Sequence, residues 1–133
     1  MTDFTMKVTS RHDYDDTVTL VRDQLAEAGF GVLTEIDIKA TLKTKLDVDV
    51  EPQIILGACR PQLAHAAMEA DPSIAAMLPC NVVVRRDGDV TVVEAFDPQA
   101  MITMASDAPD ALRDVATDAR ARLAGALQAV EKA

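Results

Sequence analysis

An Asp-Gly pair between two β-branched runs is the feature that most limits how this chain can fold. Residues 82–85 read Val-Val-Val-Arg and residues 90–93 read Val-Thr-Val-Val, with Arg86-Asp87-Gly88-Asp89 between them. Asp-Gly suits the tight turn of a β-hairpin, because the turn needs positive φ angles that these residues tolerate. The segment therefore predicts two neighbouring antiparallel strands.

Three further segments have the pattern of strands. Residues 4–9 alternate between apolar and polar side chains, the period of a half-buried strand. In residues 30–38 the same alternation places Val32, Thr34, Ile36 and Ile38 on one face, which we expect to be buried. Residues 54–56 are a continuous apolar run, as expected for a strand buried on both faces in the middle of a sheet.

Helical periodicity fills the intervals between these strands. Asp15 and Asp16 supply a helix cap and first-turn negative charge for a helix that ends at Gly29. Residues 39–46 predict a short basic helix, and Pro61 and Asp71-Pro72 begin two more. The longest apolar stripe predicts a C-terminal helix over residues 109–132.

Together these elements predict an α+β fold in which residues 1–133 form a single domain. The order β-α-β-β-α-β-β combines a crossover unit with a hairpin, so we expect a mixed sheet of about five strands and a long C-terminal helix. A right-handed crossover leaves the helices mainly on one face of the sheet. The other face of the sheet then stays exposed, and a second copy of the chain in a homodimer is the simplest way to cover it.

Composition and charge exclude several classes of partner. The formal net charge is −9, with 13 basic and 22 acidic residues, and aromatic residues make up 3%. An acidic chain with few aromatic side chains suits neither phosphate backbones nor base stacking, so we expect no nucleic-acid partner. No apolar run approaches 18 residues and no leader pattern begins the chain, so we expect no membrane partner and a cytoplasmic location.

The two cysteines are the residues of this sequence that most suggest a chemical role. Cys59 follows the central strand and precedes a helix, where peptide dipoles and the adjacent Arg60 favour a thiolate. Cys80 begins the next strand, so the two sulfurs could form a disulfide, a redox couple or half of a metal site. Buried cysteines are also often inert, and a 20-residue gap is no recognised metal spacing, so no metal ligand is assigned.

The remaining motifs favour binding over catalysis. His65 lies off the apolar stripe of its helix, and two-fold symmetry could pair it with its copy around a haem iron. The sequence has no Gly-rich phosphate loop, no G-x-S-x-G elbow and no H-E-x-x-H pair. We therefore assign no catalytic residue, and a protein without a catalytic cycle is favoured over an enzyme.

Four ordered blocks resemble a family catalogued as domain of unknown function 302. The blocks are residues 29–37, 55–61, 78–84 and 97–101, within a resemblance that spans about residues 14–104. The resemblance implies a compact α+β domain that self-associates, with both cysteines inside the motif blocks. Arg60 stands where the family pattern leads us to expect Asn, so a ligand that contacts this position would be selected differently here.

These observations predict a small homodimeric protein that binds an apolar or cofactor-like ligand of unknown identity. The candidate ligand-binding residues are Cys59, Arg60, Cys80, Asn81, Asp97 and His65. One alternative is a thiol-dependent redox or metal-handling protein that uses Cys59 and Cys80. Another is a haem-binding protein with His65 as the axial ligand.

Overall fold

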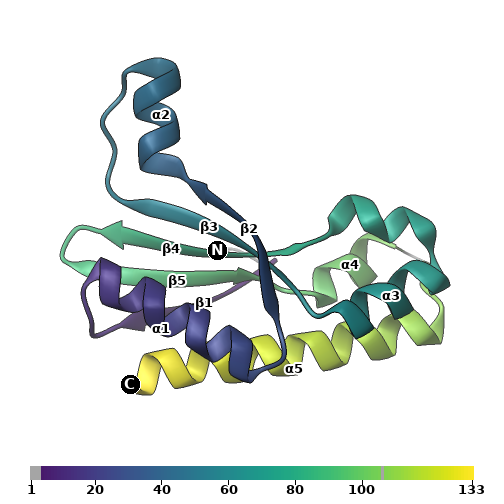
Figure 1. The fold of residues 1–133 in the computed structure, drawn as a ribbon. Coiled ribbons are helices and arrows are strands. Elements are labelled where there is room, and N and C mark those ends of the chain that lie inside the picture. The colour runs from purple at the N-terminus through teal and green to yellow at the C-terminus, as the bar shows by residue number, and fades with distance from the viewer. Residues whose placement is uncertain (1–3, 106) are drawn as a thin grey trace.

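The computed structural model describes residues 4–105 and 107–133 and has the predicted α+β architecture (Figure 1). Its strands are β1 (Thr5–Ser10), β2 (Gly31–Asp37), β3 (Gln53–Cys59), β4 (Cys80–Asp87) and β5 (Val90–Phe96). Its helices are α1 (Tyr14–Glu27), α2 (Ile38–Leu46), α3 (Pro61–Ala70), the 3-10 helix η1 (Pro72–Met77), α4 (Gln99–Met104) and α5 (Asp110–Lys132). None of the described helices has the length and apolar character needed to cross a bilayer.

The five strands form one sheet in the order β1-β5-β4-β3-β2, and each described pair of neighbours is antiparallel. The hairpin is confirmed, because Asp87 pairs with Val90 across the β4–β5 turn. The expectation of a mixed sheet is wrong. The β1-α1-β2 crossover does join two parallel strands, but these strands lie at opposite edges of the sheet with three others between them, so they never pair.

A hydrophobic core fills the space between the sheet and the helices α1 and α5, which lie on one side of it (Figure 1). The strands contribute Ile54, Leu56, Val82, Val84 and Val93, and the two helices contribute Val21, Leu25, Leu123, Leu127 and Val130. The apolar stripe of the C-terminal helix is thereby confirmed. The cap of α1 differs from the expectation, because Asp13 precedes the helix and its Oδ1 accepts from the Asp16 backbone N–H at 2.8 Å.

The buried face expected for β2 is wrong. A β-bulge between Val32 and Thr34 shifts the register, so that Val32 pairs with Ala58 and Thr34 pairs with Gly57. Because each extra residue turns the following side chains to the opposite face, Thr34 and Ile36 point away from the helices. As an edge strand, β2 leaves most of its residues exposed.

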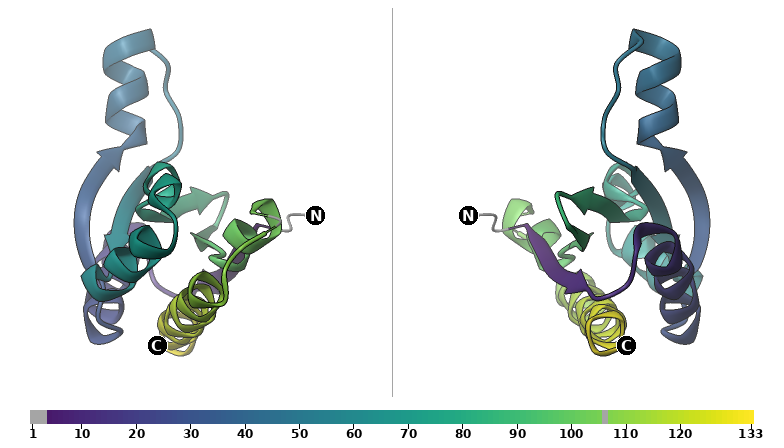
Figure 2. Two further views of the ribbon diagram at one scale, coloured as in Figure 1. Left: turned by 90° about the vertical axis from the view of Figure 1, so that its right-hand side faces the viewer. Right: turned by 90° about the vertical axis from the view of Figure 1, so that its left-hand side faces the viewer.

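The second face of the sheet is open, and α2 stands on that side (Figures 1 and 2). It follows β2 directly and rises away from α1 and α5, and none of its residues is buried. Asp37 caps the helix by accepting from the Ala40 backbone N–H at 2.9 Å. We refer to residues 38–50, comprising α2 and the loop that returns to β3, as the arm.

Gly57 is required where β2, β3 and the start of β4 approach one another. A Cβ atom at this position would lie 2.1 Å from Thr34 Oγ1 and 2.8 Å from Pro79 Cγ. We expect Gly57→Ala to lower the free energy of unfolding by about 1–3 kcal/mol, measured by urea denaturation. Gly125→Ala is the matched control, because nothing lies within 4 Å of a Cβ there and alanine favours a helix interior. A Gly57→Ala protein as stable as the parent would contradict the close approach.

Candidate functional site

The facing ends of β3 and β4 bring the two cysteines to one cavity. Cys59 ends β3 and Cys80 begins β4, and the register pairs Ala58 with Cys80. The cavity between these ends and the helices α3, α4 and α5 has a volume of about 30 Å³. Its lining consists of Phe30, Ala58, Cys59, Arg60, Leu63, Ala64, Ala67, Leu78, Cys80, Met101, Val115 and Ala119. With the exception of Arg60, these side chains are apolar or carry only a thiol.

Both thiols are free, and Cys80 is the more buried of the two. Burial raises the pKa of Cys80 to about 11, and the neighbouring Cys59 adds to that rise. Burial also raises the pKa of Cys59. The lowering of the Cys59 pKa expected from helix dipoles and Arg60 is therefore not found, because burial disfavours the charged thiolate.

Arg60 lies across the end of α1, next to a second arginine. If Gly29 carried a Cβ atom, that atom would be 3.0 Å from Arg60 Nε and 3.9 Å from Arg122 Nη1. Arg122 already has partners, since its Nε donates to Asp118 at 2.9 Å and its Nη1 donates to the Ala28 carbonyl at 3.3 Å. Arg60 Nε is buried and finds no hydrogen-bond partner among residues 4–105 and 107–133.

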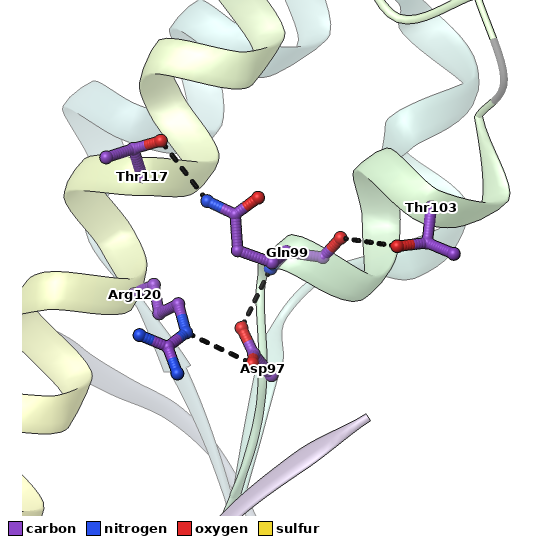
Figure 3. A network of polar contacts seen from close by, with 5 residues as sticks. All are labelled: Asp97, Gln99, Thr103, Thr117 and Arg120. Atoms are coloured by element: carbon purple, nitrogen blue, oxygen red, sulfur yellow. Dashed lines mark hydrogen bonds and ion pairs between the residues drawn. The ribbon is translucent and has the colours of Figure 1, made fainter. Parts of the chain in front are cut away.

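Asp97 fixes one wall of this cavity instead of lining it. Its Oδ1 accepts from the Gln99 backbone N–H at 2.9 Å and its Oδ2 accepts from Arg120 Nε at 3.1 Å (Figure 3). Gln99 Nε2 also donates to Thr117 Oγ1 at 3.2 Å, so the network fastens the start of α4 to α5. This attachment positions Met101, which α4 carries into the cavity lining.

The other two candidate residues lie elsewhere. Asn81 is exposed in β4 and belongs to a hollow of about 400 Å³ on the open face. His65 has a 76% exposed side chain on α3, and its Nε2 lies 3.3 Å from Glu69. The described residues hold no group of three or more His, Cys, Asp or Glu side chains placed to bind a metal ion.

The hollow on the open face is larger than the cysteine cavity, but its charged side chain, Glu94, already has hydrogen-bond partners. Its lining consists of Phe4, Thr5, Asn81, Val83, Glu94 and Phe96. Glu94 accepts from Thr5 Oγ1 at 2.6 Å and from Arg85 Nη1 at 2.7 Å. The Thr5 hydrogen bond and the Arg85 guanidinium lower the pKa of Glu94 despite its partial burial. A buried Nε without a partner among the described residues therefore distinguishes Arg60, in the lining of the cysteine cavity, from the engaged Glu94 of this hollow.

Sequence reasoning placed Arg60 near the cysteines but missed its neighbour Arg122. The apolar stripe of α5 indicates which residues face the core, whereas Arg122 lies beside that stripe and resembles an ordinary surface residue. Met101 belongs to the block of residues 97–101, which the sequence did not place beside the cysteines. No local signal connects either residue to the cysteines, because tertiary packing alone brings them together.

Comparisons with known proteins extend over nearly the whole chain. The sequence profile of a family described as "Domain of unknown function DUF302" matches residues 6–130. The fold is similar to the crystal structure of an uncharacterized conserved protein DUF302 from Bacillus stearothermophilus, with a TM-score of 0.88 and 28% sequence identity. That likeness covers 97% of this chain and 99% of the other. Comparison with curated protein sequences gives no match.

Proposed function

The chain belongs to the family Domain of unknown function DUF302, and since that description assigns no activity, we propose from its own geometry that it binds a small anionic ligand. The ligand carries a short apolar group, which enters the cysteine cavity, and an anionic group, which pairs with Arg60. Binding involves no catalytic cycle. The observation that carries this proposal is the buried, unpartnered Nε of Arg60, a residue that belongs to the lining of an apolar cavity.

Electrostatics favours an anion at this position. A buried donor without a partner costs free energy, and a guanidinium gains most from a carboxylate or a phosphate. Arg60 lies beside another guanidinium, that of Arg122, whose charge Asp118 already balances. An anion here would satisfy the Nε donor and balance the charge of Arg60, as Asp118 balances that of Arg122.

The size of the cavity limits the apolar part of the ligand. Its volume of about 30 Å³ holds roughly two water-sized groups. Typical sites for drug-sized molecules are about ten times larger or more. A carboxylate with a two- or three-carbon chain fits, and a longer ligand would leave its remainder outside the cavity. Met101 is flexible enough to adapt the lining to such a chain.

The thiol and haem alternatives receive less support. A redox or metal-binding role would need thiolates, but burial raises the pKa of both cysteines. A haem ligand would need His65 on an apolar surface, whereas this side chain is 76% exposed beside Glu69. Both thiols remain candidates for contact with the apolar group of the ligand, as small polarizable side chains.

We also propose that the protein acts as a cytoplasmic homodimer. Its two cysteines lie at neighbouring strand ends and are unbonded, which suits a reducing compartment. One face of its sheet has no helix packed over it in the described part of the chain, and a second copy would cover that face.

Titration with propionate tests the ligand proposal. We expect propionate to shift the amide NMR signals of Gly29, Cys59, Arg60 and residues 62–64 in a saturable manner, because these residues surround the Arg60 side chain. Arg60→Asn should weaken this binding by about tenfold or more, the value of one charge-assisted hydrogen bond. The neutral probe 1-propanol should bind the parent and the variant equally weakly.

Arg113→Asn is the control for loss of positive charge. Arg113 is an exposed arginine on α5, and its removal changes the net charge as much as the Arg60 variant does. The control should leave propionate binding within about twofold of the parent, since exposed charges are screened by solvent. If both variants lower the affinity equally, or if propionate shifts no signal in this region, the proposed site is wrong.

A further inference from the structure

We propose that the arm of each copy clasps the other copy in the homodimer, so that the arm tip packs on the partner's body across the open face. This inference rests on the homodimer proposed above and adds the surface that forms it. Its occupant is a second copy of this chain, in a two-fold arrangement in which each arm makes the same contact.

The open face has an apolar strip that the chain itself does not cover. Ile36 pairs with Ile55 across β2 and β3, and Ile55 pairs with Val83 across β3 and β4. These three side chains share one face of the sheet, opposite the face that packs on α1 and α5. A contiguous apolar strip on an uncovered sheet is typical of a surface that another chain covers.

The arm exposes two apolar side chains at its tip, on either side of Asp47. Leu46 is 66% exposed and Val48 is 43% exposed. An isolated helix as short as α2 is marginal in water, and helices in proteins gain most of their stability from packing an apolar face. Since α2 buries none of its residues in the single chain, a contact with another molecule would supply that packing.

The length of α2 suits a contact across two packed sheets. With 9 residues, the helix is about 13 Å long, whereas face-to-face sheets lie about 10 Å apart. It stands on the open side of the sheet (Figure 1). When a second sheet covers this face, the tip of α2 therefore reaches the partner's layer, and Leu46 and Val48 meet it.

Charge favours a copy of the same chain as the partner. α2 carries Lys39, Lys43 and Lys45, and although Lys43 pairs with Asp47 and Asp49 of the returning loop, the arm keeps a net charge of +1 on a chain whose net charge is −9. A basic helix on an acidic protein is attracted to a second copy and, in a two-fold dimer, meets the acidic body reciprocally. Lys45 projects from the last turn, next to the apolar tip.

Sedimentation velocity of the full chain over a concentration series tests the clasp. We expect the parent to sediment at twice the chain mass of 14.3 kDa. The double variant Leu46→Asp with Val48→Asp should raise the dimer dissociation constant at least about tenfold, because it places two carboxylates in an apolar contact. Both side chains are exposed in the single chain, so the variant should keep the parent's circular dichroism spectrum and unfolding midpoint when monomeric.

Leu33→Asp is the matched control. Leu33 is a leucine of similar exposure, 64%, in the bulge of β2 and outside the arm. It should leave the dissociation constant within about twofold of the parent. A dimer that the arm variant does not weaken, or one that Leu33→Asp disrupts instead, overturns the clasp but keeps the homodimer. A parent that sediments as a monomer at all concentrations overturns both.

Discussion

Cys80 is expected to react with iodoacetamide at pH 7 about a hundredfold more slowly in the folded protein than in the same chain unfolded in urea. An ordinary thiol with a pKa of about 8.5 is roughly 3% ionised at this pH. Burial raises the pKa of Cys80 to about 11, which lowers the ionised fraction by roughly 300-fold. The greater basicity of the remaining thiolate restores about tenfold of the rate. Restricted access then lowers it again, since the residue is only 6% exposed.

Timed alkylation followed by peptide mass spectrometry measures both cysteines in one experiment. Cys59 should react faster than Cys80, because it is less buried and its pKa rises less. The single variants Cys59→Ser and Cys80→Ser show whether each rate depends on the other thiol. Raising the pH should accelerate both reactions up to the pKa of each thiol. A Cys59 that reacts at pH 7 as fast when folded as in urea would restore the thiol-dependent function as the stronger hypothesis.

Most of the fold could be predicted because its signals are local. The Asp87-Gly88 turn, the apolar run at residues 54–56 and the stripe of α5 each depend on a period within one element. The bulge in β2 has no such signal, and this single insertion reversed the face assigned to Thr34 and Ile36. The strand that pairs with β1 could not be predicted from hydrophobic periodicity either, because it depends on which edge of the sheet the β1-α1-β2 crossover reaches.

The candidate site could be predicted only in part, for a related reason. Cys59, Arg60 and Cys80 line one cavity because β3 and β4 are neighbours, an arrangement that the sequence left open. The sign of the Cys59 pKa shift could not be predicted, since it depends on how much water the surrounding helices exclude. Asn81 follows Cys80 directly, yet strand alternation sends it to the opposite face. Residues that are adjacent in the sequence are therefore not all adjacent at this site.

Leu123→Ala is expected to lower the free energy of unfolding by about 2–5 kcal/mol, a large share of the stability of a domain this size. Leu123 is fully buried, and its removal would open a cavity in the core between α5, α1 and the sheet. The same helix carries Val115 and Ala119 into the cysteine cavity and holds Arg122 beside Arg60. Loss of packing along α5 should therefore also increase hydrogen exchange at the ends of β3 and β4.

Urea denaturation of the Leu123→Ala protein, followed by circular dichroism, measures this loss. Leu33→Ala is the control, because the same chemical change at a 64% exposed leucine should alter the stability by no more than about 0.5 kcal/mol. If the slope of the free energy of unfolding against urea concentration is unchanged in both variants, the folded and unfolded states keep their compactness. If Leu123→Ala proved as harmless as the control, α5 would not be the helix that closes the core, and the cavity wall it supplies would need another explanation.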